Sequence, residues 1–130
     1  MKETAVAYET ETGLSFEEAV QRCREALAKE GFGVLTEIDV QATLKKKLDV
    51  DREPYLILGA CHPPSAHRAL TAVPEVGVLL PCNVTVSREE GKTVVRAMNP
   101  QAALGLLGSP VLGEVACEVG AALKRVVAAV

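Results

Sequence analysis

A thiol and an imidazole stand side by side at Cys61 and His62, where an apolar run ends in two prolines. Thiolate nucleophiles use a cysteine and a histidine within hydrogen-bonding reach of each other. Adjacent residues of a strand point to opposite faces, so this pair suits a dyad only if the following turn redirects one side chain. The nearby His67 adds no recognised zinc spacing, such as a paired CxxC. The simplest interpretation places Cys61 in the core and His62 at the surface or in a helix cap.

A second thiol lies in a disturbed apolar run. Pro81, Cys82 and Asn83 interrupt a segment that otherwise has the composition of a strand. Irregularities of this kind cluster near functional sites because they re-aim side chains. Cys82 is expected on the apolar face of the strand, which favours a buried and inert thiol. Asn83 is expected on the opposite face, where it would need hydrogen-bond partners if it were buried.

Two carboxylates form a third candidate. Glu37 and Asp39 are two residues apart in the phrase TEIDV, so on a strand they share one face at about 6–7 Å. Such a pair could act as acid and base, or as ligands of a hard metal ion. A solvent-facing sheet edge explains the same pattern. No Gly-rich phosphate loop, nucleophile elbow or zinc-protease helix accompanies any candidate, which disfavours the common cofactor enzymes.

Length and composition indicate one domain over residues 1–130, large enough to fold around its own core without disulfides or metal. Hydrophobic residues make up 48% and charged residues 24%, which is typical of a globular chain. Aromatic residues are only 3%, with no Trp. The core is therefore expected to consist of Ala, Val and Leu.

The net charge of −3 argues against nucleic acid as a partner. The N-terminus has no apolar secretory segment and no window is long and apolar enough to span a membrane. The four widely spaced cysteines do not suggest disulfides. A cytoplasmic location is the resulting expectation.

Helix signals are clear at two places. Ser15 and Glu18 form a capping box before a helix that ends near Gly31. Along it, a stripe at helical spacing includes Cys23, which is expected to be a small core residue. Ser109 and Pro110 begin the last helix. Shorter helices are predicted in QATLKKKL and SAHRAL.

About five strands are predicted, in the segments ETAVAYE, GVLTEIDV, EPYLILGAC, VGVLLPCNVTV and TVVRAM. The last two flank the turn SREEGK and form a hairpin. Pro81 cannot donate to a ladder, so its strand is expected at an edge or with a bulge. The fold class is therefore α+β, with a mostly antiparallel sheet and two long helices packed on one face.

Several phrases together resemble the prokaryotic family called domain of unknown function 302. They are GFGVLTEIDVQATLKKKL, PYLILGACHPPSAHRAL, GVLLPCNVTV and VVRAMNP, within Phe32 to Pro100. The resemblance implies a curved antiparallel sheet packed by helices, similar in outline to the TATA-binding-protein fold, and a homodimer. It implies no established activity. Relatives commonly have Asn where this chain has His62, which weakens a Cys–His dyad.

Three functions remain open from the sequence. The first is binding of a small ligand or metal ion in a cleft lined by Glu37, Asp39, Cys61, Cys82 and Asn83, because these polar groups cluster in apolar strands. The second is a thiol-dependent enzyme or redox protein that uses Cys61 or Cys82. The third is a homodimeric interaction module without catalytic activity. The sequence does not establish whether Cys61 and Cys82 are close in space.

Overall fold

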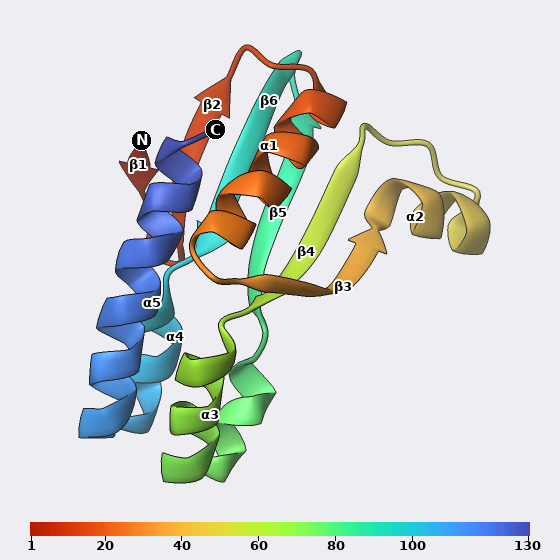
Figure 1. Cartoon of the computed structure of the whole chain (residues 1–130). Helices are drawn as coiled ribbons and strands as arrows, with labels where there is room; N and C mark the ends of the chain where they lie inside the picture. Colours follow the sequence, from red (N-terminus) through yellow and green to blue (C-terminus); the bar gives the residue numbers. More distant parts are fainter.

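A six-stranded antiparallel sheet forms the centre of the molecule (Figure 1). The computed structural model describes all residues 1–130, and the strand order is β1-β2-β6-β5-β4-β3. The prediction of an α+β fold is confirmed, although the sheet has six strands and every pairing is antiparallel. The strands are β1 (Lys2–Glu3), β2 (Ala7–Thr12), β3 (Gly33–Asp39), β4 (Tyr55–Cys61), β5 (Cys82–Glu89) and β6 (Lys92–Met98).

The two longest helices, α1 and α5, lie side by side against one face of the sheet (Figure 1). Cys23 and Leu27 of α1 are fully buried there, so the prediction of a core role for Cys23 is confirmed. None of the helices has the length and apolarity needed to cross a membrane. The helical segments are α1 (Phe16–Lys29), α2 (Val40–Leu48), α3 (Pro63–Ala72), η1 (Pro74–Leu79), α4 (Pro100–Leu104), η2 (Gly105–Leu107) and α5 (Pro110–Ala128).

Side-chain caps determine where the long helices begin. The Ser15 hydroxyl accepts a hydrogen bond from the Glu18 amide at 3.1 Å and donates one to the Glu18 carboxylate. At the start of α5, the Ser109 hydroxyl accepts from the Leu112 amide. These bonds satisfy amide groups that have no partner within the helix. Both helix starts were predicted correctly from these residues.

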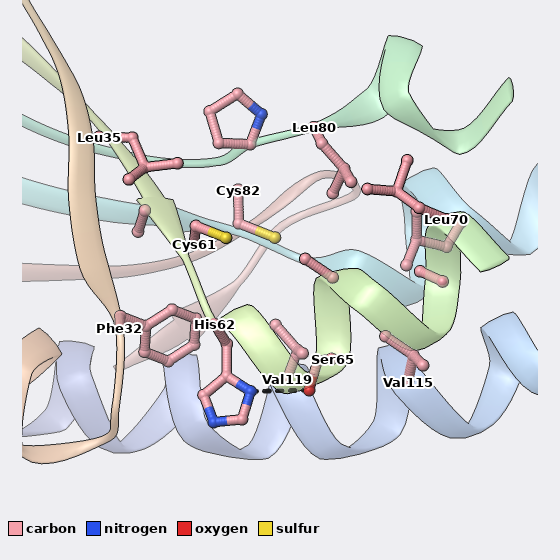
Figure 2. Close-up of a pocket in the computed structure, with 15 residues that line it drawn as sticks. Phe32, Leu35, Cys61, His62, Ser65, Leu70, Leu80, Cys82, Val115 and Val119 are labelled. Carbon is pink, nitrogen blue, oxygen red and sulfur yellow. Dashed lines mark hydrogen bonds between the residues drawn. The ribbon is translucent and has the colours of Figure 1, made fainter. Parts of the chain in front are cut away.

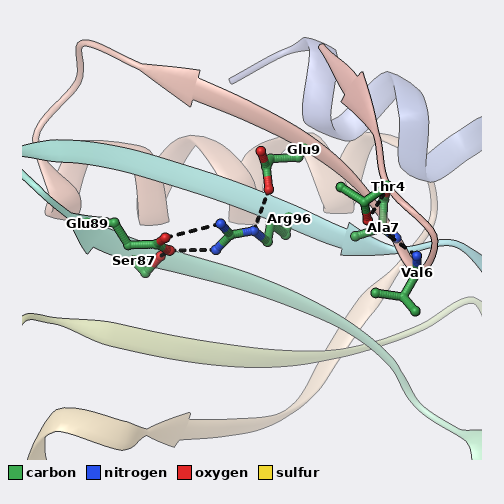
Figure 3. Close-up of polar contacts among 7 residues, drawn as sticks. All are labelled: Thr4, Val6, Ala7, Glu9, Ser87, Glu89 and Arg96. Carbon is green, nitrogen blue, oxygen red and sulfur yellow. Dashed lines mark hydrogen bonds and ion pairs between the residues drawn. The ribbon is translucent and has the colours of Figure 1, made fainter.

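The face of the sheet away from α1 and α5 carries a charged cluster (Figure 3). Arg96 donates hydrogen bonds to Glu9 on β2, at 2.6 Å, and to Glu89 on β5. Hydrogen bonds from Arg96 and from the Ser87 hydroxyl lower the pKa of Glu89 to about 2. Ion pairs between Arg96 and two glutamates therefore connect β2, β6 and β5 across the open face.

The turn that adds β1 lies at the edge of the same sheet. In this turn the Thr4 hydroxyl accepts a hydrogen bond from the Ala7 amide at 2.9 Å (Figure 3).

The apolar run before Cys82 is the largest departure from the predicted elements. Residues Pro74–Leu79 form the 3₁₀ helix η1, and β5 begins only at Cys82. Pro81 precedes the strand because it has no N–H to donate to the ladder. The prediction of an edge or bulged strand was wrong, since β5 lies between β4 and β6.

Gly59 of β4 lies where the neighbouring strands leave no room for a side chain. It pairs with Thr36 of β3, just beyond a register shift in that strand, and with Asn83 of β5. A Cβ atom added to Gly59 would lie 2.0 Å from Thr36 Oγ1 and 2.9 Å from Pro81 Cγ. Only glycine therefore allows β3, β4 and the residue before β5 to meet at this point.

The substitution Gly59→Ala is expected to lower the free energy of unfolding by about 1–3 kcal/mol, because the added methyl group overpacks a closed site. Urea unfolding followed by circular dichroism measures this change. Gly33→Ala on β3 is the matched control, since no atom lies within 4 Å of its Cβ position. Adding Thr36→Ala should recover part of the loss. Equal midpoints for wild type and Gly59→Ala would contradict the account.

Candidate functional site

A cavity of about 280 Å³ lies at the end of the sheet where β4 leads into α3 (Figure 2). We call it the sheet-end cavity. Fifteen residues line it, twelve of them hydrophobic, and they come from β4, α3, the start of β5, α4, α5 and the segment around the start of β3. No Asp, Glu, Lys or Arg is among them. The cavity is therefore an apolar space without a charged wall.

Antiparallel pairing of β4 with β5 brings Cys61 and Cys82 to the same cavity. In this register Ala60 pairs with Cys82, so the last residue of β4 lies beside the first residue of β5. Both cysteines line the cavity, and both are free thiols (Figure 2). Cys61 is half-buried and Cys82 is buried. The pairing of the two strands thus answers a question that the sequence left open.

His62 and Ser65 add hydrogen-bonding atoms to one wall of the cavity (Figure 2). His62 Nδ1 lies 2.8 Å from Ser65 Oγ, and the imidazole lies 5.5 Å from the Phe32 ring, centroid to centroid. His62 occupies the N-cap position of α3 without bonding a backbone amide through its side chain. Neither Ser65 nor Phe32 was predicted from the sequence as a site residue. The three-residue spacing from His62 to Ser65 was the available signal for the former.

Burial controls the protonation of the second thiol. Desolvation raises the pKa of Cys82 to about 11, and the nearby Cys61 acts in the same direction. A thiol with such a pKa remains protonated near neutral pH. Because the thiolate is the nucleophilic form of cysteine, this environment disfavours Cys82 as a catalytic nucleophile.

Glu37 and Asp39 lie away from the two cysteines. Glu37 forms an ion pair with Arg24 of α1, Oε2 to Nη2, at 2.8 Å. Asp39 caps α2 by accepting a hydrogen bond from the Ala42 amide at 2.9 Å. Both line a separate shallow cavity between α1, β3 and the start of β4. On β3, Glu37 lies four residues beyond Gly33, the partner of Cys61, which corresponds to about 13 Å of strand.

Asn83 does not line the sheet-end cavity and is exposed to solvent. Of the five residues expected in one cleft, the structure therefore brings together only Cys61 and Cys82. Glu37 and Asp39 share a second cavity, where each already has a structural partner. No three His, Cys, Asp or Glu side chains come together in an arrangement that could hold a metal ion.

Comparisons with known proteins agree with this fold and name no activity. The family model described as "Domain of unknown function DUF302" matches residues 8–130. The crystal structure of an uncharacterized conserved protein DUF302 from Bacillus stearothermophilus is similar, with a TM-score of 0.88 and 32% sequence identity. That similarity covers 94% of this chain and 95% of the other. A search of curated proteins found no match.

Thiol labelling with iodoacetamide tests the electrostatics of the site. In the native protein, the exposed Cys117 is expected to be labelled readily, whereas labelling of Cys82 should be slow and should keep rising toward pH 11. Peptide mapping by mass spectrometry separates the positions, and urea-unfolded protein is the control in which both should react alike. Half-maximal labelling of native Cys82 near pH 7 would contradict the assignment.

Proposed function

Because this chain belongs to the DUF302 family, whose description names no activity, we propose its function from the sheet-end cavity. The chain binds a small, uncharged and largely apolar molecule there. One observation carries this proposal: twelve of the fifteen residues that line the cavity are hydrophobic, and its two polar side chains, His62 and Ser65, hydrogen-bond to each other. Predominantly hydrophobic walls are typical of small-molecule sites.

The size and charge of the cavity support a small neutral ligand. Its volume of about 280 Å³ lies just below the range of small-molecule pockets, about 300–1,000 Å³, which restricts it to a small ligand. A charged group inside it would be taken out of water without an opposite charge, which is costly. The ligand-binding role first expected for Glu37, Asp39 and Asn83 finds no support in the geometry of this cavity, which none of the three lines.

Filling the cavity should abolish binding of a neutral apolar probe. Ala66 of α3 lines the cavity and is half-buried, so Ala66→Phe places a ring in the space. The dye N-phenyl-1-naphthylamine is expected to fluoresce with wild type and to lose at least tenfold in affinity with Ala66→Phe. Ala72→Phe is the matched control, because Ala72 is exposed on the same helix. Equal dye affinity for Ala66→Phe and wild type would overturn the proposal.

A second proposal, a homodimer, concerns the segment of residues 35–53, which we call the β3–α2 arm. None of its side chains is buried, and Leu35 and Ile38 are 68% and 48% exposed. In Figure 1 α2 projects beyond the body of the molecule. β3 is an edge strand of the sheet, so its outer N–H and C=O groups have no strand partner.

We propose that a second copy of this chain covers the β3–α2 arm. Antiparallel pairing of two identical edge strands is self-complementary, as a two-fold dimer requires. Leu35 belongs both to the arm and to the lining of the sheet-end cavity. A partner along β3 would therefore also shield one side of the cavity from water.

A charge on the edge strand should prevent this assembly. Ile38→Lys is expected to convert a dimer into a monomer, because charged side chains block edge pairing. Size-exclusion chromatography with light scattering reports the mass. Val78→Lys serves as the control, since Val78 on η1 is 87% exposed and lies outside the arm. A monomeric wild type, or a dimeric Ile38→Lys variant, would contradict the proposal.

A further inference from the structure

The strongest unexplained feature of the sheet-end cavity is its pair of thiols. Cys61 and Cys82 both line it, both are free, and neither has a charged neighbour in the cavity wall. A core that needed only packing atoms could place Ala or Val at these positions. The inference below rests on the proposed function, because it specifies the ligand of the same cavity.

The strand register places the backbones of the two cysteines near each other. Cys82 pairs with Ala60, the residue before Cys61, so the Cα atoms of the two cysteines are expected about 6 Å apart, from the spacing of antiparallel pairs and the rise per residue. Alternation along a strand would send the two Cβ atoms to opposite faces, but Cys61 is the last residue of β4, and both sulfurs point into the same cavity (Figure 2). An atom placed between the two sulfurs relaxes the geometry further, because the sulfurs then need not touch.

The electrostatics of the cavity restrict what can bridge these thiols. A metal ion held by thiolates usually takes four ligands, and no three His, Cys, Asp or Glu side chains come together here. The environment also keeps Cys82 in its protonated, neutral form. A ligand that replaces both thiol protons, leaves a neutral product and needs no further protein ligand fits this space, which is lined by Leu70, Val115 and Val119.

We propose that the sheet-end cavity is a dithiol site for an uncharged thiophilic molecule, a trivalent arsenic centre that carries a small apolar group. In the step, the arsenic atom forms one bond to the sulfur of Cys61 and one to the sulfur of Cys82. The arsenic–oxygen double bond of the arsenoso group breaks, and its oxygen leaves as water with the two thiol protons. No electron is transferred, and the product is neutral. The apolar group lies against the hydrophobic walls of the cavity.

Phenylarsine oxide is the probe, because its phenyl ring supplies the apolar group. Native wild-type protein is incubated with one equivalent, washed with excess 2-mercaptoethanol and analysed by intact mass spectrometry. A monothiol wash removes arsenic held by one cysteine but not by two. The expected result is one adduct per chain, with the mass of the probe less one water, which 2,3-dimercaptopropanol releases.

Single cysteine variants locate the adduct. Cys61→Ala and Cys82→Ala should each lose it, whereas Cys23→Ala, which removes a different buried thiol, and Cys117→Ala, which removes an exposed one, should keep it. Circular dichroism confirms that each variant is folded. Retention of the washed adduct by folded Cys61→Ala or Cys82→Ala would overturn the dithiol site.

Dye binding separates this inference from the proposed function. Wild type that binds N-phenyl-1-naphthylamine but forms no wash-resistant adduct would overturn the dithiol site and leave the apolar site intact. Wild type that binds neither would overturn both. Dye binding that is lost when the arsenic adduct forms is the result expected if both are correct, because the two probes then occupy the same cavity.

Discussion

The antiparallel pairing of β4 with β5 is the constraint on which the candidate site depends. It places the last residue of one strand beside the first residue of the other, so that Ala60 pairs with Cys82. Two cysteines that are 21 positions apart in the sequence (82 minus 61) thereby line one cavity. Gly59 makes the pairing possible, since any larger residue would collide with Thr36 on one side and Pro81 on the other.

The character of the cavity follows from what surrounds this junction. The chain leaves β4 through His62 and enters α3, so the walls combine residues at the strand ends with apolar residues of α3, α4 and α5. Charged side chains gather instead on the open face of the sheet, where Arg96 bridges Glu9 and Glu89. Because the charged side chains lie away from the cavity, the two thiols have no charged neighbour in its wall. Burial there raises the pKa of Cys82. The chemistry proposed for the site depends on that separation.

Local rules predicted the parts of the fold that depend on neighbouring residues. The caps at Ser15 and Ser109 and the hairpin around Gly91 were found from short patterns, because their hydrogen bonds and backbone angles are local. The run before Cys82 was misassigned as a strand, because its apolar residues form η1 and Pro81 delays the ladder. The composition of a short apolar run does not by itself distinguish a strand from a helical segment.

The site shows the same division between local and long-range information. Asp39 was a candidate acid, yet it caps α2, a role for which the same residue type is favoured. Nothing near Cys61 in the sequence indicates that Cys82 lies beside it, because strand order and register decide that contact. Candidate residue types were therefore recognisable from the sequence, whereas their grouping required the sheet.

Two-dimensional ¹H–¹⁵N NMR during titration with N-phenyl-1-naphthylamine tests the central claim most directly, because it reports every backbone amide at once. The account predicts saturable shifts concentrated where β4 meets α3, at the start of β5, and around Val115 and Val119 of α5, the segments that line the cavity. Shifts confined to the open face around Arg96 or to α2, with these segments unchanged, would contradict it.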